Sequence, residues 1–323
     1  MEMVKLSDYV MDFVSRLGVG TVFLLPGGGC MHLVESLGSN EDLEYVCCLH
    51  EQAVSIAADA YGQYTNNIGV ALVTTGPGGS NTLTGLAASW IDSIPALFIS
   101  GQVKRDDLIG DRGVRQMGFQ ELNIVDVMEP VTKYAVTVME PETIRYHLEK
   151  AVYLARNGRP GPVWIDIPLD VQAANIDESS MKGFDPAEIE KPEDTSLKGP
   201  VEEVIRLLNQ AERPVILAGN GIRLGRALDD FLQLIDILDI PCLTTWKAID
   251  FMPEDHPLYI GRPGAVGQRA ANFAQQTSDL IIILGARLDL GQTGYNHANF
   301  ARNAKKVMVD VDRKEIEKME MTI

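Results

Sequence analysis

Glu51 is the residue with the clearest chemical potential in this sequence, because it follows an apolar run and opens a segment of small residues. It stands in the triplet His50-Glu51-Gln52, directly after LEYVCCL and at the start of EQAVSIAADAYGQY. Small side chains allow such a helix to press closely on a sheet or on a bound ring. A carboxylate held in a dry site can exchange a proton with a ligand. The alternative is that Glu51 only complements the helix dipole.

A glycine-rich turn forms the second chemical feature and also lies at a strand-to-helix junction. It reads Thr74-Thr75-Gly76-Pro77-Gly78-Gly79-Ser80-Asn81. Glycines permit close backbone approach, and a following helix offers free N–H groups to a ligand. The Gly-Lys-Ser/Thr ending of a phosphate-binding loop is absent, so a tight connecting turn is the alternative.

Several other chemistries are excluded by spacing. His50-Glu51 lacks the second histidine of a zinc-protease helix, and no G-x-S-x-G nucleophile elbow occurs. The run Pro26-Gly27-Gly28-Gly29 does not supply the G-x-G-x-x-G of a hydride-transferring dinucleotide enzyme. The four cysteines form no C-x-x-C pair, and we expect them to be buried and without disulfides.

The elements that must position these residues alternate between short apolar runs and helical segments. Most of the runs are continuous, as in strands buried on both faces of a parallel sheet; they are TVFLLP, LEYVCCL, GVALVTT, PALFIS and GPVWIDIP. Residues 172–199 are polar, acidic and broken by prolines, and alternation resumes afterwards. The sequence therefore predicts an α/β fold with two doubly wound, mainly parallel domains, 1–171 and 200–323, joined by an exposed linker over 172–199.

Charge and hydropathy limit the partners. The formal net charge of −17 argues against nucleic acid or an anionic membrane as the main partner. It does not exclude a phosphorylated ligand, which backbone N–H groups can hold. The first residues predict an amphipathic helix rather than a secretory signal, and no apolar stretch is long enough to span a bilayer. We therefore expect a cytoplasmic protein.

Seven motifs in fixed order carry a family resemblance. They are Pro26-Gly27-Gly28, His50-Glu51-Gln52, Gly76-Pro77-Gly78, Asp92-Ser93-Ile94-Pro95, Gly101-Gln102, Phe119-Gln120-Glu121 and Gly158-Arg159-Pro160-Gly161-Pro162-Val163. This order resembles the thiamine-diphosphate family that contains acetolactate synthase, pyruvate oxidase and related 2-oxo acid enzymes. The likeness is to the N-terminal and central domains of an acetolactate synthase large (catalytic) subunit, and it is more specific in the first domain.

The resemblance implies that residues 1–171 bind the aminopyrimidine ring of thiamine diphosphate. Glu51 is then the catalytic carboxylate, which promotes the imino tautomer that removes the C2 proton of the thiazolium ring. Gly28, Phe119 and Gln120 are implied to border the substrate. The implied cofactor-binding residues are Glu51, Pro26, Gly27, Thr75, Gly76, Pro77 and Asn81.

The second domain resembles the central domain, which cradles FAD in some relatives. Gly219, Gly221, Gly285 and Arg287 stand at suitable strand ends for FAD or a nucleotide, although plain tight turns are the alternative. Gly291 replaces an arginine that helps to place substrate and FAD in acetolactate synthases. The segment Thr245-Trp246-Lys247-Ala248-Ile249-Asp250 also departs from the family pattern. A carboligase or decarboxylase for another 2-oxo acid is therefore a further alternative.

The metal-binding pattern of the family does not occur in this sequence. The family holds Mg²⁺ and the diphosphate through Gly-Asp-Gly followed by Asn-Asn, and neither stands at a suitable place here. We expect no metal ligand in this chain, a C-terminal diphosphate-binding domain absent from it, and no catalysis by the chain alone. The complete enzyme, a homodimer or homotetramer, would decarboxylate and ligate pyruvate as a transferase or lyase of branched-chain amino acid biosynthesis. The alternative is a non-catalytic FAD- or nucleotide-binding regulatory module.

Overall fold

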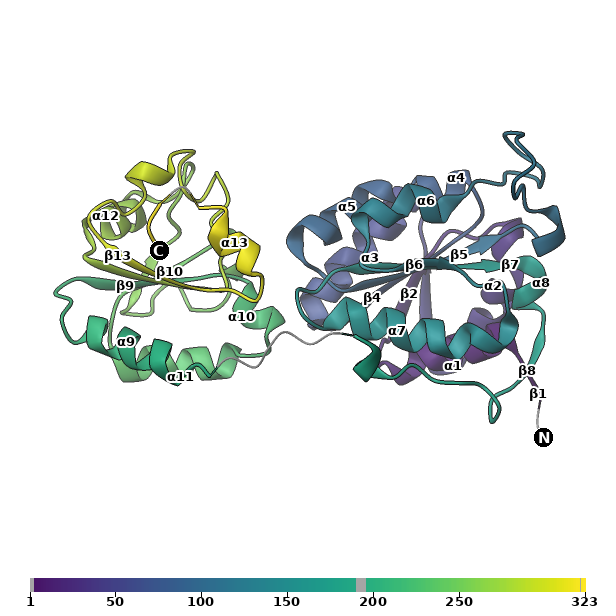
Figure 1. Cartoon of the computed structure of the whole chain (residues 1–323), viewed down its shortest axis with the longest axis horizontal. Helices are drawn as coiled ribbons and strands as arrows, with labels where there is room; N and C mark the ends of the chain where they lie inside the picture. Colours follow the sequence, from purple (N-terminus) through teal and green to yellow (C-terminus); the bar gives the residue numbers. More distant parts are fainter. Residues whose placement is uncertain (1–2, 190–195, 320) are drawn as a thin grey trace. The chain divides into compact units, whose positions relative to one another are not determined.

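The computed structural model describes residues 3–189, 196–319 and 321–323. It divides into two compact units, Met1–Glu190 and Lys191–Ile323. Each unit has a parallel sheet with helices on both faces (Figure 1), which confirms the predicted α/β class.

The first unit is built on a six-stranded sheet in the order β3-β2-β4-β5-β7-β6. Every strand pair in it is parallel. The central strands β4, β5 and β7 are buried at every position, as their continuous apolar sequences predict. The strands are β2 (Thr21–Leu24), β3 (Glu44–Cys47), β4 (Gly69–Val73), β5 (Ala96–Gln102), β6 (Ala135–Thr137) and β7 (Pro162–Pro168).

Helices cover both faces of this sheet (Figure 1). One face packs against α1 (Leu6–Arg16), α2 (Met31–Ser39) and α7 (Ile144–Arg156). The other packs against α3 (Glu51–Thr65), α5 (Leu83–Asp92) and α6 (Ile124–Met128). On that second face the rings of Phe98 and Trp164 stack with centroids 5.5 Å apart. The core therefore lies on both sides of the sheet, and the strand ends remain free to form a site.

Strand β3 corrects one expectation. The run LEYVCCL predicts a buried strand, yet every residue of β3 is exposed because the strand lies at the edge of the sheet. Cys47 is exposed and Cys48 is half-buried, whereas Cys30 and Cys242 are buried as predicted. All four are free thiols. An apolar run indicates a strand, but it does not reveal whether the strand is central or at an edge.

The predicted linker begins as part of the first unit. Strand β8 (Asn175–Asp177) pairs antiparallel with β1 (Met3–Lys5), and Ile176 and Met181 are buried in the core. The backbone N–H of Phe184 donates a hydrogen bond to Glu149 on α7, at 2.7 Å. A polar, proline-containing segment thus packs on the domain through isolated apolar anchors, which the composition of residues 172–199 does not disclose.

The second unit contains a five-stranded parallel sheet in the order β11-β10-β9-β12-β13. One face packs against α9 (Lys198–Leu208), α10 (Gly221–Leu224) and α11 (Leu228–Leu238). The other packs against α12 (Arg269–Thr277) and α13 (Arg313–Glu317). The strands are β9 (Pro214–Ala218), β10 (Cys242–Thr244), β11 (Tyr259–Gly261), β12 (Leu280–Leu284) and β13 (Lys305–Val309). Within the described ranges, no helix has the length and hydropathy needed to cross a membrane.

Candidate active site at the carboxyl edge of the first sheet

The order of the strands marks where a ligand site should lie. From β2 the chain moves outward to β3 and then returns to the other side of β2 with β4. In open parallel sheets, ligands bind outside the carboxyl ends of the strands at such a reversal. The turn after β2 contains Pro26 to Gly29, and the turn after β4 contains Thr74 to Gly78. The fold thus places two predicted glycine turns side by side at this point.

Close backbone packing joins these two turns. The N–H of Gly29 donates to the hydroxyl of Thr74 at 3.0 Å, and the hydroxyl of Thr75 donates to the carbonyl of Gly101 at 3.1 Å. A Cβ on Gly27 would lie 2.5 Å from the Cβ of Thr74. Pro26 and Gly28 stand exposed on the same turn. The glycines after β2 are therefore needed for the close approach of the turns.

Glu51 is the first residue of α3, and His50 is the N-cap of that helix. The His50 ring accepts a hydrogen bond from the N–H of Gln52 at 3.0 Å, which gives His50 a capping role. Glu51 is only 9% exposed, and its Oε2 accepts a hydrogen bond from the side chain of Asn81 at 2.9 Å. A Cβ on Gly78 would lie 3.6 Å from the Glu51 Oε1. The structure thus joins Glu51 to the Thr74–Asn81 turn.

Removal of the Asn81 side chain should destabilise the protein. The variant Asn81→Ala leaves a nearly buried carboxylate oxygen without its donor, and we expect the free energy of unfolding to fall by about 1–2 kcal/mol. Denaturant titration measures this change. Asn40→Ala is the matched control, because Asn40 donates to Asp12 at the same 2.9 Å but on the exposed surface. Equal losses in both variants would contradict a special environment at Glu51.

The segment that contains Phe119 and Gln120 closes over the Gly76 turn. Gln120 has a φ of 60°, and a Cβ added to Gly76 would overlap the carbonyl oxygen of Gln120. Four residues along, the side chain of Ile124 packs within 2.9 Å of the Cβ position of Gly79. The Phe119 side chain is 85% exposed. The predicted substrate residues thus lie at the same sheet edge as Glu51.

Asp166, a buried carboxylate close to this segment, was not identified from the sequence. Asp166 on β7 is fully buried and accepts hydrogen bonds from Ser100 at 2.5 Å, Gln102 at 3.1 Å and Thr137 at 3.1 Å. The Trp164 ring donates to Ser100 at 2.9 Å. A charged residue inside the apolar run GPVWIDIP was the signal that could have revealed this network.

The Asp166 carboxyl should make stability depend on pH. Burial raises its pKa to about 7, although its three hydroxyl and amide donors act in the opposite direction. Between about pH 4 and pH 7 the folded protein holds a proton that the unfolded chain has lost, so the free energy of unfolding falls as pH rises through this range. The full effect is about 4 kcal/mol, at about 1.4 kcal/mol per pKa unit.

Urea unfolding at several pH values measures this slope. The side chain in Asp166→Asn has no proton to lose. Between pH 5 and pH 8 the free energy of unfolding should therefore fall much less in this variant than in the wild-type protein. Identical pH profiles for the wild-type protein and the variant would show that Asp166 ionises in the folded protein as it does in the unfolded chain.

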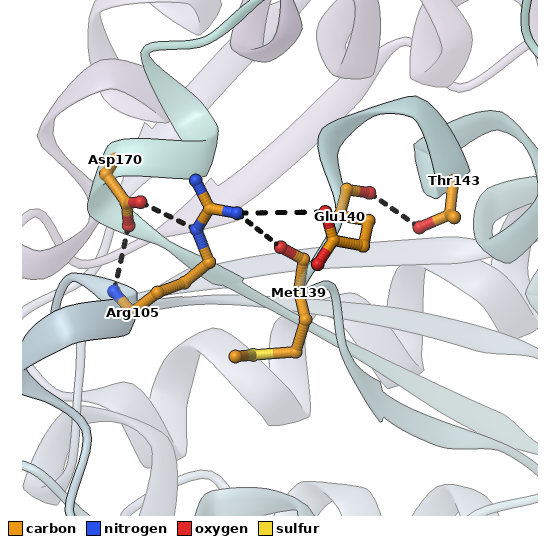
Figure 2. A network of polar contacts seen from close by, with 5 residues as sticks. All are labelled: Arg105, Met139, Glu140, Thr143 and Asp170. Atoms are coloured by element: carbon orange, nitrogen blue, oxygen red, sulfur yellow. Dashed lines mark hydrogen bonds and ion pairs between the residues drawn. The ribbon is translucent and has the colours of Figure 1, made fainter.

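Arg105 anchors the chain just after β5 (Figure 2). Its backbone N–H and its guanidinium donate to the two carboxylate oxygens of Asp170, at 3.0 and 2.7 Å, and the guanidinium also donates to the carbonyl of Met139 at 2.9 Å. Burial would raise the pKa of Asp170, but the hydrogen bonds and charge of Arg105 outweigh it and lower the pKa. Glu140 lies 4.0 Å from the same guanidinium. This network ties the start of the 103–122 segment to the ends of β6 and β7.

The second sheet reverses between β9 and β12, and the predicted FAD or nucleotide residues follow these two strands. Gly219 donates to the carbonyl of Leu284 at 2.8 Å, and Gly221 donates to the carbonyl of Gly285 at 2.9 Å. Gly285 has a φ of 59° and lies against Gly221. The partly buried Arg287 makes no hydrogen bond or ion pair with any residue that the structure describes. The three glycines thus pack on one another, and a guanidinium stands beside them.

Within residues 3–189, 196–319 and 321–323, no group of three or more His, Cys, Asp or Glu side chains is placed to hold a metal ion.

Family models match both units. Residues 4–127 match the thiamine pyrophosphate enzyme N-terminal TPP binding domain, and residues 201–323 match the thiamine pyrophosphate enzyme central domain. The first match includes Glu51, the Gly76 turn and the Phe119–Gln120 segment. The second includes Gly219, Gly285 and Arg287.

Curated relatives extend this likeness over nearly the whole chain. The acetolactate synthase large subunit of Lactococcus lactis is 34% identical over 319 residues, which is 98% of this chain and 54% of the relative. A probable acetolactate synthase large subunit of Methanocaldococcus jannaschii is 35% identical over 97% of this chain and 52% of its own length. The chloroplastic acetolactate synthase of Arabidopsis thaliana is 34% identical over 97% of this chain and 46% of its own length.

The chain therefore spans about half the length of the curated relatives that it matches. The two family models, the two parallel α/β units and the ordered motifs agree. The chain belongs to the thiamine pyrophosphate enzymes, and it carries the N-terminal and central domains of that family.

Proposed function

We propose that this chain serves a thiamine-diphosphate-dependent decarboxylase and carboligase of 2-oxo acids, of the acetolactate synthase kind. Pyruvate is the proposed substrate, and branched-chain amino acid biosynthesis is the proposed process. The observation that carries the proposal is the nearly buried Glu51 carboxylate, held by Asn81 at the strand-order reversal of the first unit. The names of the relatives and the family of the first unit support the cofactor.

The residues around Glu51 fit an aminopyrimidine ring. The Oε2 atom is occupied by Asn81, while Oε1 makes no hydrogen bond to any described residue and faces the side-chain-free Gly78. An oxygen in this position can share a proton with a ring nitrogen. The exposed Pro26, the partly buried Gly27 and the Thr75–Pro77 turn supply the surrounding walls. We propose these residues and Asn81 as the cofactor-binding set.

The chemistry divides between the cofactor and the chain. Thiamine diphosphate supplies a thiazolium ring that stabilises the negative charge left when a 2-oxo acid loses carbon dioxide. Glu51 would share a proton with a nitrogen of the bound ring, and it would hold or release that proton there. The exposed ring of Phe119 can cover an apolar part of the substrate, and the Gln120 carboxamide can donate to its carboxylate. Gly28 leaves room on the opposite turn.

Further parts of the proposal concern the complete enzyme. Mg²⁺ and the diphosphate would be held by residues other than those described here. The enzyme would be a homodimer or homotetramer in the cytoplasm. The exposed apolar side chains Val46 on β3, Leu49 in the following turn and Ile56 on α3 support an association of subunits.

FAD or nucleotide binding by the second unit is a second candidate function. The Gly219–Gly221 and Gly285 turns at the reversal of the second sheet favour it, together with the guanidinium of Arg287, which pairs with no residue that the structure describes. Absorbance of the purified protein tests for flavin, and Arg287→Met should weaken its retention at least tenfold. Full flavin occupancy in that variant would exclude Arg287, and no flavin uptake by the wild-type chain would exclude the candidate function.

The proposed activity is tested by turnover. The intact enzyme, supplied with thiamine diphosphate and Mg²⁺, should release carbon dioxide from pyruvate and form a ligated 2-hydroxy-3-oxo acid. Release from another 2-oxo acid in a panel, but not from pyruvate, would reassign the substrate. Cofactor binding without turnover of any 2-oxo acid would contradict the proposed activity and favour a non-catalytic module.

A further inference from the structure

The long segment between β5 and α6 is tied at both ends to one side chain. Gln102 is the last residue of β5 and is 2% exposed. Its carboxamide oxygen accepts a hydrogen bond from the N–H of Val103 at 3.0 Å, and its Nε2 donates to the carbonyl of Leu122 at 3.0 Å. The segment 103–122, which we call the site loop, therefore begins and ends on the Gln102 amide.

Asp166 holds the nitrogen of this amide from the neighbouring strand β7. The second Nε2 hydrogen of Gln102 donates to the Oδ2 of Asp166 at 3.1 Å. The Leu122 carbonyl can only accept and the Val103 N–H can only donate, so the Gln102 nitrogen must face Leu122 and its oxygen must face Val103. Ser100 and Thr137 hold the carboxylate from other directions. The Val103 end of the segment thus meets the carboxamide oxygen of Gln102, and the Leu122 end meets its nitrogen.

Contacts inside the site loop draw it together near its closing end. The buried Glu121 carboxylate accepts hydrogen bonds from the backbone N–H groups of Ile109, Met117 and Gly118, the last two at 3.0 Å. A Cβ on Gly118 would lie 2.7 Å from the side chain of Val103. The loop is therefore a closed unit, and its geometry depends on its two ends remaining together.

The closing end of this loop carries the residues that face the site. Gln120 places its carbonyl oxygen against Gly76, and Phe119 stands exposed beside it. We infer that Gln102, held by Asp166, is a positioning residue that clamps the site loop and thereby sets where Phe119 and Gln120 stand relative to the Gly76 turn and Glu51. The effect of this clamp on substrate binding rests on the proposed function.

Hydrogen–deuterium exchange on the full 323-residue chain tests the clamp without any cofactor. In Gln102→Leu, both loop ends lose their hydrogen bonds, and the loop amides of Ile109, Met117 and Gly118 should exchange about tenfold faster or more. Thr137→Val is the matched control, because it removes one hydrogen bond from Asp166 and leaves both loop contacts intact. Its loop amides should exchange at the wild-type rate.

A double variant distinguishes the loss of the loop contact from a general loss of folding. Gln102→Glu combined with Asp166→Asn reverses the donor and acceptor of the buried pair, so the hydrogen bond between β5 and β7 is kept. It also aims a carboxylate oxygen at the Leu122 carbonyl, which needs a donor. We expect faster exchange in the loop and wild-type exchange in the Ala96–Gln102 strand. Unchanged loop exchange in both Gln102 variants would overturn the clamp.

Kinetics on the intact enzyme test the link to substrate. The double variant should raise the KM for the 2-oxo acid at least tenfold and leave the rate of C2 proton exchange on the cofactor within about threefold, since Glu51 and Asn81 are untouched. Faster loop exchange with an unchanged KM would overturn the link. A wild-type enzyme without turnover would contradict the proposed function instead, and the exchange result alone would then support or overturn the clamp.

Discussion

Replacement of Glu51 by glutamine should slow C2 deprotonation of bound thiamine diphosphate by about 10²–10⁴-fold. The amide has the size of the carboxyl and can still accept the Asn81 hydrogen bond, but it cannot exchange a proton with the ring. The expected loss therefore comes from proton transfer rather than from packing. Deuterium exchange at C2, quenched at short times and measured by NMR on the intact enzyme, gives the rate directly.

Asp59→Asn is the control for this variant. Asp59 lies on the same helix and is also 9% exposed, and its carboxylate is held by Ser89 at 2.7 Å and by Gln63 at 2.5 Å. Its replacement should lower stability and leave C2 exchange near the wild-type rate. Wild-type exchange in Glu51→Gln would remove Glu51 from its proposed role. Equal slowing in both variants would indicate general damage to α3.

Gly76→Ala should strongly destabilise the protein. Gly76 has a φ of 59°, which strains any residue with a Cβ, and the new methyl group would overlap the carbonyl oxygen of Gln120. We expect a loss of about 1–3 kcal/mol in the free energy of unfolding. The added group would also push the Phe119–Gln120 segment away from the turn.

Variants at two other glycines separate the effect of backbone strain from the effect of the contact with Gln120. Gly113 has a φ of 69° with no atom near its Cβ position, so Gly113→Ala measures backbone strain alone. Gly28→Ala adds a methyl group in open space and should be nearly neutral. Denaturant unfolding of the four proteins compares them. A loss in Gly76→Ala no greater than that in Gly113→Ala would show that the contact with Gln120 carries no energy.

The sequence predicts most of the first unit because its central strands are fully buried. Continuous apolar runs at β4, β5 and β7 indicate buried parallel strands, and parallel strands bring their carboxyl ends to one edge. Glu51, Gly76 and Gln120 all follow such ends, so their meeting is a consequence of the topology. The β3 run failed as a guide to burial, because strand order depends on contacts that a local pattern does not contain.

The supporting network could not be predicted for a different reason. Gln102 and Asp166 are 64 residues apart. The charge of Asp166 stands out in its apolar run, but no local pattern identifies the residues that it contacts. The pairing of Gln102 with Asp166 depends on β5 and β7 being neighbours, which only the folded sheet reveals. The same holds for residues 172–189, whose polar composition hides the pairing of β8 with β1. Long-range contacts, rather than propensities, decide these features.

The central claim is that the Glu51 carboxyl pairs with the aminopyrimidine ring of thiamine diphosphate. NMR of the intact enzyme loaded with cofactor that is ¹⁵N-labelled in this ring tests the pairing directly. We predict that the resonance of one ring nitrogen is displaced by its hydrogen bond in the wild-type enzyme and in Asp59→Asn, and returns toward its free position in Glu51→Gln. An identical ring-nitrogen resonance in all three proteins would contradict the assignment.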